Sequence, residues 1–216
     1  MRYELKYSIA ENQIYKIDKW LNSISNLRSA YKQRKVSSIY FDDNMYSSAQ
    51  DNIDGISERK KYRLRWYNKN TVKNFYEIKI KKKRLSKKII FSSVKEFNIK
   101  CIKNLFSYEN RDILDKTFSE RLIGKNLEPK LKVSYNRNYY TAGKIRITID
   151  KNLEFSLFED LKFNNKFMDN KIIMEIKFEE FEYADGLKLV NQCFTSPVRF
   201  SKYVRGLSLC GLANYY

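Results

Sequence analysis

Five stretches of the chain alternate between charged and large apolar residues, which is the pattern of a β-strand with two unlike faces. Successive side chains in a strand point to opposite faces, so residues two apart share a face. The stretches are Arg2–Ser8, Lys61–Tyr67, Phe75–Lys81, Lys144–Asp150 and Ile172–Phe178. Their charged faces carry the pairs Glu4 and Lys6, Arg63 and Arg65, Glu77 and Lys79, Arg146 and Asp150, and Glu175 and Lys177. Phe75 and Ile173 fall on these faces as exceptions.

The charged faces have two interpretations. By alternation alone, the usual arrangement is an antiparallel sheet with one face in water. Against this, Arg and Glu recur at matched spacing, whereas a water-facing sheet uses Thr, Ser and Lys freely. The alternative is a sheet that closes into a barrel with this face turned inward. Enclosed charges need partners, because an unpaired buried charge is very costly. A polyanion with a divalent metal would satisfy both signs, since Arg and Lys bind phosphate oxygens and carboxylates bind hard cations.

The rest of the pattern predicts helices and strands that interleave without βαβ regularity. Predicted helices are Glu11–Ser25, a segment near Asn44–Asn52, Val94–Leu105, Ile113–Ile123, Tyr183–Phe194 and the tail from Ser201, with Ser as its N-cap. Predicted strands are Lys35–Asp42 and Lys130–Thr141, the second joined to Lys144–Asp150 through Ala142-Gly143. Asp42 and Asp43 are interpreted as caps of the helix that follows them. The fold class is α+β with a mostly antiparallel sheet.

Composition points to one domain and a polyanionic partner. The chain has 216 residues with few Gly and Pro and no linker-like stretch, which favours a single domain over residues 1–216. Its net charge of +18 is compatible with nucleic acid, a membrane surface or polyphosphate. Lysines and an arginine also crowd a predicted hairpin over residues 79–88, which is either a solvated turn or a region that steers anions.

The chain has no histidine, so His-based acid–base chemistry, Ser-His-Asp triads and His metal ligands are excluded. Its cysteines, Cys101, Cys193 and Cys210, are odd in number and far apart, which indicates neither a disulfide framework nor a zinc site. No apolar run approaches the length of a membrane span, and the N-terminus enters a strand at once. We therefore expect a cytoplasmic location.

Eight segments, read in order, resemble the VTC or polyphosphate polymerase domain, within the CYTH or triphosphate tunnel metalloenzyme group. They are RYELKY (Arg2–Tyr7), SSIYFDD (Ser37–Asp43), KYRLRWY (Lys61–Tyr67), YEIKIK (Tyr76–Lys81), PKLKVSYNR (Pro129–Arg137), IRITID (Ile145–Asp150), MEIK (Met174–Lys177) and RFSKY (Arg199–Tyr203). No single motif is decisive, but their common order is specific. RLRWY and FSKY point to the VTC branch in particular.

The resemblance implies an antiparallel barrel that forms a tunnel, with helices outside, and a triphosphate or polyphosphate bound in its basic lumen. The residues that would act on the phosphates in catalysis are Arg63, Arg65, Lys79, Arg137, Arg146 and Lys202. Those that would bind the substrate are Lys6, Tyr135, Arg199 and Ser201, with Arg199 standing where the family usually has Lys. Glu175 matches the carboxylate that holds Mn²⁺ or Mg²⁺.

The resemblance further implies a metal-dependent phosphoryl transferase that lengthens polyphosphate from ATP. The sequence carries neither an SPX regulatory domain nor a membrane span, so it looks like a free-standing bacterial version. Glu4 and Glu77 are extra carboxylates, as in tunnel triphosphatases, and they keep hydrolysis open as an alternative. A binder of polyphosphate or nucleic acid without catalysis is the third hypothesis, although we expect no specific nucleic acid partner and cannot name a membrane-protein partner.

Several of these residues also have ordinary structural interpretations. Taken alone, the pairs Glu77/Lys79 and Glu175/Lys177 are typical of exposed ion pairs on a sheet surface. Trp66 is better interpreted as a core or rim aromatic, and Tyr135 allows the same interpretation. Asp150 is either a turn residue at a strand end or a partner of a lumen cation.

Overall fold

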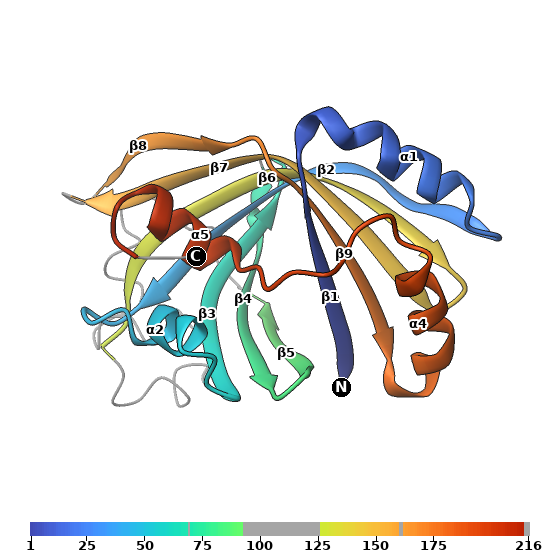
Figure 1. The fold of residues 1–216 in the computed structure, drawn as a ribbon. Coiled ribbons are helices and arrows are strands. Elements are labelled where there is room, and N and C mark those ends of the chain that lie inside the picture. Colours follow the sequence, from blue (N-terminus) through green and yellow to red (C-terminus); the bar gives the residue numbers. More distant parts are fainter. Residues whose placement is uncertain (69, 93–125, 160–161, 214–216) are drawn as a thin grey trace.

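The chain forms one antiparallel sheet in the computed structural model, which describes residues 1–68, 70–92, 126–159 and 162–213 (Figure 1). Within these residues the strands are β1 (Arg2–Ile9), β2 (Leu27–Asp42), β3 (Glu58–Tyr67), β4 (Asn70–Lys82), β5 (Leu85–Ser92), β6 (Glu128–Ala142), β7 (Ile145–Glu159), β8 (Lys162–Asp169) and β9 (Ile172–Glu179). The helices are α1 (Ile14–Asn22), α2 (Ser47–Ile53), α4 (Tyr183–Asn191) and α5 (Lys202–Leu209), with 3-10 turns η1 (Glu11–Gln13) and η4 (Glu180–Glu182).

The sheet closes into a barrel. Its strands follow the order β6-β2-β3-β4-β5-β1-β9-β7, and β6 also pairs with β7, which joins the two ends of that series. β8 stays outside the ring and pairs with the second half of β7, from Leu153 to Glu159. The first half of β7, from Arg146 to Asp150, pairs with β9 instead. Closure leaves each of the eight ring strands with an inward and an outward face.

Two helices cover the outward apolar face of one side of the barrel (Figure 1). Ile17 and Leu21 of α1 pack in one buried cluster with outward residues of β1, β7 and β9, and Leu189 of α4 joins the same cluster. Ile147 and Met174 are among the strand residues that they contact, and each is 0% exposed. The apolar alternation of these strands is thus satisfied on the outside, which leaves their charged faces to the inside.

Helix α5 behaves differently from α1 and α4, because it packs against the inward face of the barrel. Tyr203, Val204 and Leu207 form a buried cluster with inward residues of β2, β6 and β7, including Leu131 and Phe155. Ser201 caps the helix, and its Oγ accepts a hydrogen bond from the backbone N–H of Val204 at 3.4 Å. The α5 helix therefore fills the apolar part of the interior, and the charged part remains beside the start of the helix.

The closed barrel confirms the predicted fold class, but α5 packs inside it, contrary to the expectation that the helices lie outside, and several element boundaries differ. Ala142 of β6 pairs with Ile145 of β7, so the two-residue turn between these strands is Gly143-Lys144, one residue later than expected. Strand β7 runs to Glu159, so Asp150 lies inside a strand and the turn interpretation of Asp150 is wrong. The periodicity did not predict β8, and the predicted helices over residues 94–105 and 113–123 lie outside the described residues.

Other expectations on these elements are confirmed. Asp42 accepts hydrogen bonds from the N–H groups of Ser48 and Ala49, and Asp43 accepts from that of Ser47, so both carboxylates cap α2. Trp66 is 4% exposed and belongs to the core. Within the described part of the chain, no helix is long and apolar enough to cross a membrane.

Gly206 is the point at which α5 comes closest to the barrel wall. A Cβ atom there would lie 2.4 Å from Cδ1 of Phe155 and 2.5 Å from Cδ2 of Leu131. We expect Gly206→Ala to lower the free energy of unfolding by roughly 1–3 kcal/mol, the usual cost of overpacking a core. Thermal denaturation measures this, with Ser208→Ala in the same helix as the control. An unchanged melting temperature in Gly206→Ala would show that α5 does not pack as described.

Candidate functional site

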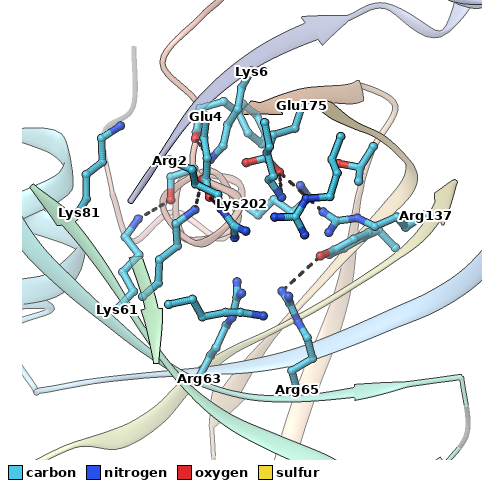
Figure 2. Close-up of a pocket in the computed structure, with 18 of the residues that line it drawn as sticks. Arg2, Glu4, Lys6, Lys61, Arg63, Arg65, Lys81, Arg137, Glu175 and Lys202 are labelled. Carbon is cyan, nitrogen blue, oxygen red and sulfur yellow. Dashed lines mark hydrogen bonds and ion pairs between the residues drawn. The ribbon is translucent and has the colours of Figure 1, made fainter. Parts of the chain in front are cut away.

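The inward charged faces enclose a cavity of about 610 Å³, here called the lumen (Figure 2). The carboxylates among the residues that line it are Glu4 and Glu175. Basic residues far outnumber them: Arg2, Lys6, Arg59, Lys61, Arg63, Arg65, Lys79, Lys81, Lys87, Lys88, Arg137, Arg146, Lys177, Arg199 and Lys202. The lumen is therefore strongly electropositive.

All of the site residues predicted from the sequence line this one cavity. They come from six strands, from the segment that leads into α5 and from the first residue of α5. They are Lys6 (β1), Arg63 and Arg65 (β3), Lys79 (β4), Tyr135 and Arg137 (β6), Arg146 (β7), Glu175 (β9), Arg199, Ser201 and Lys202. The figure shows Arg63 and Arg65 on one wall and Lys6, Glu175 and Lys202 across from them (Figure 2). The interpretation of these charges as a solvated sheet surface is therefore wrong.

Glu77 holds the two arginines of β3 in position. Its Oε2 lies 2.6 Å from Nε and Nη2 of Arg63 and 3.5 Å from Nη1 of Arg65, while Lys88 contacts Oε1 at 2.9 Å. Glu77 is 2% exposed, and burial opposes its ionisation, but these cations lower its pKa far below the usual value. This carboxylate is therefore a counter-ion that orients the arginines, and three cations already occupy it.

A second carboxylate, Asp150, organises the opposite wall. Both of its oxygens accept from the Arg137 guanidinium, at 2.5 and 2.7 Å, and Nζ of Lys202 lies 2.6 Å from Oδ2. Asp150 is fully buried, and these two cations outweigh burial to lower its pKa. Asp150 is thus a partner of lumen cations, and it links β6 to the first turn of α5.

Glu4 and Glu175 lie beside each other in the lumen with lysines around them. Nζ of Lys79 forms an ion pair with Glu4, and Nζ of Lys177 lies 2.8 Å from Oε2 of Glu175. Burial opposes ionisation of Glu4, yet Lys79 and Lys177 lower its pKa to about 2. Burial likewise opposes ionisation of Glu175, and Lys177 and Lys6 lower its pKa well below the usual value. Both carboxylates are therefore ionised at neutral pH, and neither is an exposed surface residue.

Some lumen lysines are less basic than usual. Loss of solvation in the interior, together with repulsion by Lys79, lowers the pKa of Lys6 from 10.5 to about 7. Loss of solvation also lowers the pKa of Lys61 well below 10.5, and repulsion by Lys6 adds to this. Nζ of Lys6 donates to the backbone carbonyl of Phe200 at 2.8 Å, and Nζ of Lys61 donates to Oγ of Ser201 at 2.6 Å. An anion placed among these groups would restore their positive charge.

Three predicted residues have additional or peripheral positions. Ser201 lines the lumen but also caps α5, so its hydroxyl stabilises that helix. Arg199 lies at the cavity edge, where its Nη2 donates to the carbonyls of Asn52 and Ile53 at the end of α2. Arg146 is exposed, and lies in the lining opposite Lys177 of β9.

Sequence reasoning missed Lys61 and Tyr40 as site residues. Lys61 stands two residues before Arg63 on the same strand face, so the alternation itself carried this signal. Tyr40 accepts a hydrogen bond from Nη1 of Arg63 at 3.2 Å and stacks on Tyr203 of α5. The role of Tyr40 depends on the pairing of β2 with β3 and on the position of α5 inside the barrel, and a local sequence pattern reveals neither.

The lowered pKa of Lys6 predicts how stability depends on pH. The unfolded chain binds more protons than the folded protein between pH 7 and 10.5, so this group makes the ligand-free protein more stable as pH rises through that window. Lys6→Met should raise the melting temperature near pH 7 and reduce the slope above it. Melting curves over a pH series measure this, with Lys19→Met on the exposed surface of α1 as the control. A slope in Lys6→Met equal to that of the wild type would contradict the assignment, whereas a reduced slope that remains is expected from Lys61, whose pKa is also lowered.

Comparisons with solved structures identify the same fold elsewhere. The crystal structure of a candidate adenylate cyclase from Vibrio parahaemolyticus is similar with a TM-score of 0.53 and 16% identity, covering 96% of this chain and 97% of that one. The PH1012 protein from Pyrococcus horikoshii is similar with a TM-score of 0.55 and 10% identity, covering 95% and 99%. At these identities the likeness concerns the fold alone.

Comparison with protein families is more specific. None of the curated proteins compared with the sequence matches it. The family model of the VTC domain matches residues 1–210, which include every strand and helix described above. The chain therefore belongs to the VTC domain family.

Proposed function

We propose that this domain binds the triphosphate of ATP, or the end of a polyphosphate chain, in its lumen and lengthens polyphosphate by metal-dependent phosphoryl transfer. The observation that carries the proposal is the enclosure of cations on facing walls of one closed barrel. Arg63 and Arg65 stand on β3, while Arg137 and Lys202 stand across from them. A linear polyanion placed between these walls contacts cations on both sides.

The balance of charge supports such a ligand. Glu77 and Asp150 neutralise part of the charge of their arginine and lysine neighbours, and Glu4 and Glu175 offset two lysines. Lys6 and Lys61 form no ion pair with a carboxylate in the described part of the chain, and loss of solvation together with repulsion by Lys79 lowers the pKa of Lys6 to about 7. Phosphate oxygens compensate cations well, because charge-assisted hydrogen bonds are short and strong. Binding a polyphosphate would therefore relieve repulsion that the ligand-free fold contains.

Glu175 and Glu4 are the residues that would hold Mn²⁺ or Mg²⁺. Both are ionised and line the lumen, where lysines are their present partners, whereas Glu77 and Asp150 are not among the residues that line the cavity. The described residues contain no group of three or more acidic or cysteine side chains that could hold a metal alone. This fits Mg²⁺, which commonly takes one or two carboxylates and completes its shell with water and substrate phosphates. When bound, the metal would neutralise charge on the phosphate oxygens.

The residues of the chain would supply position and charge. Arg63, Arg65 and Arg137 present guanidinium groups that match phosphate oxygens, and Glu77 and Asp150 fix the orientation of those groups before substrate arrives. Phosphoryl transfer asks mainly for positioning and charge stabilisation, so a site without histidine is adequate. A phosphate chain end is already ionised, and its attack needs no general base. The hydroxyl of Tyr135 lies 3.4 Å from Nη2 of Arg65 and is placed to donate to phosphate.

Hydrolysis of triphosphate is the second candidate function. It is favoured by Glu4, an extra carboxylate in the lumen beside Glu175. A carboxylate there could position a water molecule as the phosphoryl acceptor in place of a phosphate chain. The same lumen would then release phosphate.

Product analysis with purified protein, ATP and Mn²⁺ or Mg²⁺ separates these functions. Long polyphosphate would support the polymerase, and free phosphate without polymer would support the triphosphatase. If ATP binds but remains unchanged with either metal, the catalytic proposal fails and a binding module remains. If neither ATP nor tripolyphosphate binds, the whole proposal is wrong.

Substitutions of Glu175 and Arg63 should impair the proposed activity in different ways. Glu175→Gln removes the proposed metal carboxylate, which also repels the substrate, so we expect kcat to fall by roughly 100-fold with little loss of ATP affinity. Arg63→Ala removes a contact made before and during transfer, so binding should weaken as well. Steady-state kinetics and calorimetry measure these changes, with Glu11→Gln on the surface as the control. Full metal-dependent turnover in the Glu175→Gln variant would contradict the assignment of Glu175 as the metal ligand and would favour Glu4 instead.

A closed lumen should also distinguish polyphosphate from duplex DNA. A duplex is too wide to enter a barrel of this size, so it could contact only outer lysines, and its affinity should fall steeply with salt. We expect tripolyphosphate to bind more tightly than duplex DNA at moderate salt, and DNA not to displace it. Competition measured by fluorescence anisotropy tests this. Tighter binding of DNA, with no competition from tripolyphosphate, would favour a nucleic-acid surface.

A further inference from the structure

One edge of the lumen is lined by tyrosines grouped around a single arginine. The guanidinium of Arg34 lies 4.8 Å from the ring centre of Tyr31, 5.8 Å from that of Tyr67 and 5.9 Å from that of Tyr139. The rings of Tyr31 and Tyr139 meet edge to face with 5.5 Å between their centres. We call these three tyrosines and Arg34 the tyrosine cluster. All three tyrosines line the lumen.

The backbone of β2 is irregular where it forms this cluster. From Leu27 to Lys35 the strand pairs with β6 but not with β3, whose pairing begins at Val36. The register against β6 shifts on both sides of Tyr31, between Ser29 and Tyr31 and again between Tyr31 and Arg34. Such bulges redirect side chains and are common next to functional sites. Here they bring Tyr31 and Arg34, three residues apart, to one group of rings.

The cluster continues directly into the phosphate-binding part of the lumen. Arg137 and Tyr139 are two residues apart on β6, and the Arg137 guanidinium lies 5.9 Å from the Tyr139 ring centre. The guanidinium groups of Arg137 and Arg34, residues that are paired across β6 and β2, therefore both lie near the Tyr139 ring. A molecule with an anionic tail among Arg137, Arg65 and Lys202 would extend its other end past Tyr139 to Tyr31.

Packing alone does not account for the exposed ring of Tyr31. The residue is 57% exposed, so most of its surface contributes little to the core. Its neighbours nevertheless hold the ring in place through Arg34 and Tyr139. No carboxylate contacts Arg34 among the described residues, whereas Arg137 opposite it is paired with Asp150. A positioned, exposed ring beside a cation is typical of surfaces on which nucleobases stack.

We propose that the tyrosine cluster is a subsite for the nucleobase of a nucleoside triphosphate, with the base stacked on Tyr31 while the triphosphate lies in the lumen. The inference rests on the proposed triphosphate binding and adds the part of the substrate that distinguishes ATP from an inorganic phosphate chain. Stacking needs no match of hydrogen bonds, so the subsite takes any base and favours the larger purines. The base leaves the cluster when the diphosphate product departs, whereas a polyphosphate chain passes the cluster without stacking.

The test compares two ligands that differ in the nucleoside. ATP and inorganic tripolyphosphate are titrated by calorimetry, each with Mg²⁺, into the wild type and the Tyr31→Ala and Tyr31→Phe variants. Loss of one stacking contact corresponds to about tenfold in affinity. We expect Tyr31→Ala to lower the affinity for ATP by about tenfold and the affinity for tripolyphosphate by less than twofold. Tyr31→Phe should retain the affinity for ATP. Tyr15→Ala, which removes another exposed ring on α1, is the matched control and should change neither.

The outcomes separate this inference from the function on which it rests. Equal losses for both ligands in Tyr31→Ala, or no loss for either, would overturn the nucleobase subsite and leave triphosphate binding intact. If the wild type binds neither ATP nor tripolyphosphate, the proposed function itself is overturned. A loss in Tyr31→Phe equal to that in Tyr31→Ala would also refute stacking, because the phenyl ring keeps the stacking surface.

Discussion

The enclosure of charged side chains inside a closed barrel is the constraint on which the rest of this structure depends. An isolated charge removed from water is very costly, so the buried carboxylates on the charged inward faces are surrounded by cations. Glu77 meets this requirement with Arg63, Arg65 and Lys88, and Asp150 meets it with Arg137 and Lys202. These contacts join strands far apart in sequence and leave the guanidinium groups fixed at the lumen surface. The interactions that make burial of the charges tolerable also orient them toward a ligand.

Helix α5 divides the interior into an apolar part and a charged part. Tyr203, Val204 and Leu207 fill the inward face of the strands where Leu131 and Phe155 stand, and the helix approaches so closely that only glycine fits at position 206. Its first residue, Lys202, then enters the charged part and pairs with Asp150. The positive end of the helix dipole lies at the same place. One element thus completes the core and contributes to the candidate site.

The family assignment and the geometry constrain function at different levels. Membership in the VTC domain family rests on a match over residues 1–210, and the solved structures compared here establish the barrel fold. The choice between the two proposed reactions, polymer synthesis and hydrolysis, would depend on Glu4 beside Glu175 and on which acceptor can reach the phosphate. The tyrosine cluster adds a third determinant, because it concerns the part of the substrate outside the phosphate tail. In the proposed function, chemistry and substrate selection would therefore depend on different parts of the same cavity.

The sequence by itself determined the strand faces, the net charge and the absence of histidine, because alternation with a period of two and residue counts are local properties. Alternation placed Arg63, Arg65 and Glu175 on charged strand faces, whereas Tyr135, Arg137 and the residues near α5 were predicted from the family resemblance. All of them line one lumen. Only the tertiary structure decided which charges neutralise each other, since the partners of Asp150 lie on β6 and α5. It also decided the bulges at Tyr31, because register depends on the neighbouring strand. Local patterns fix the direction of a side chain, whereas closure of the sheet fixes what that side chain meets.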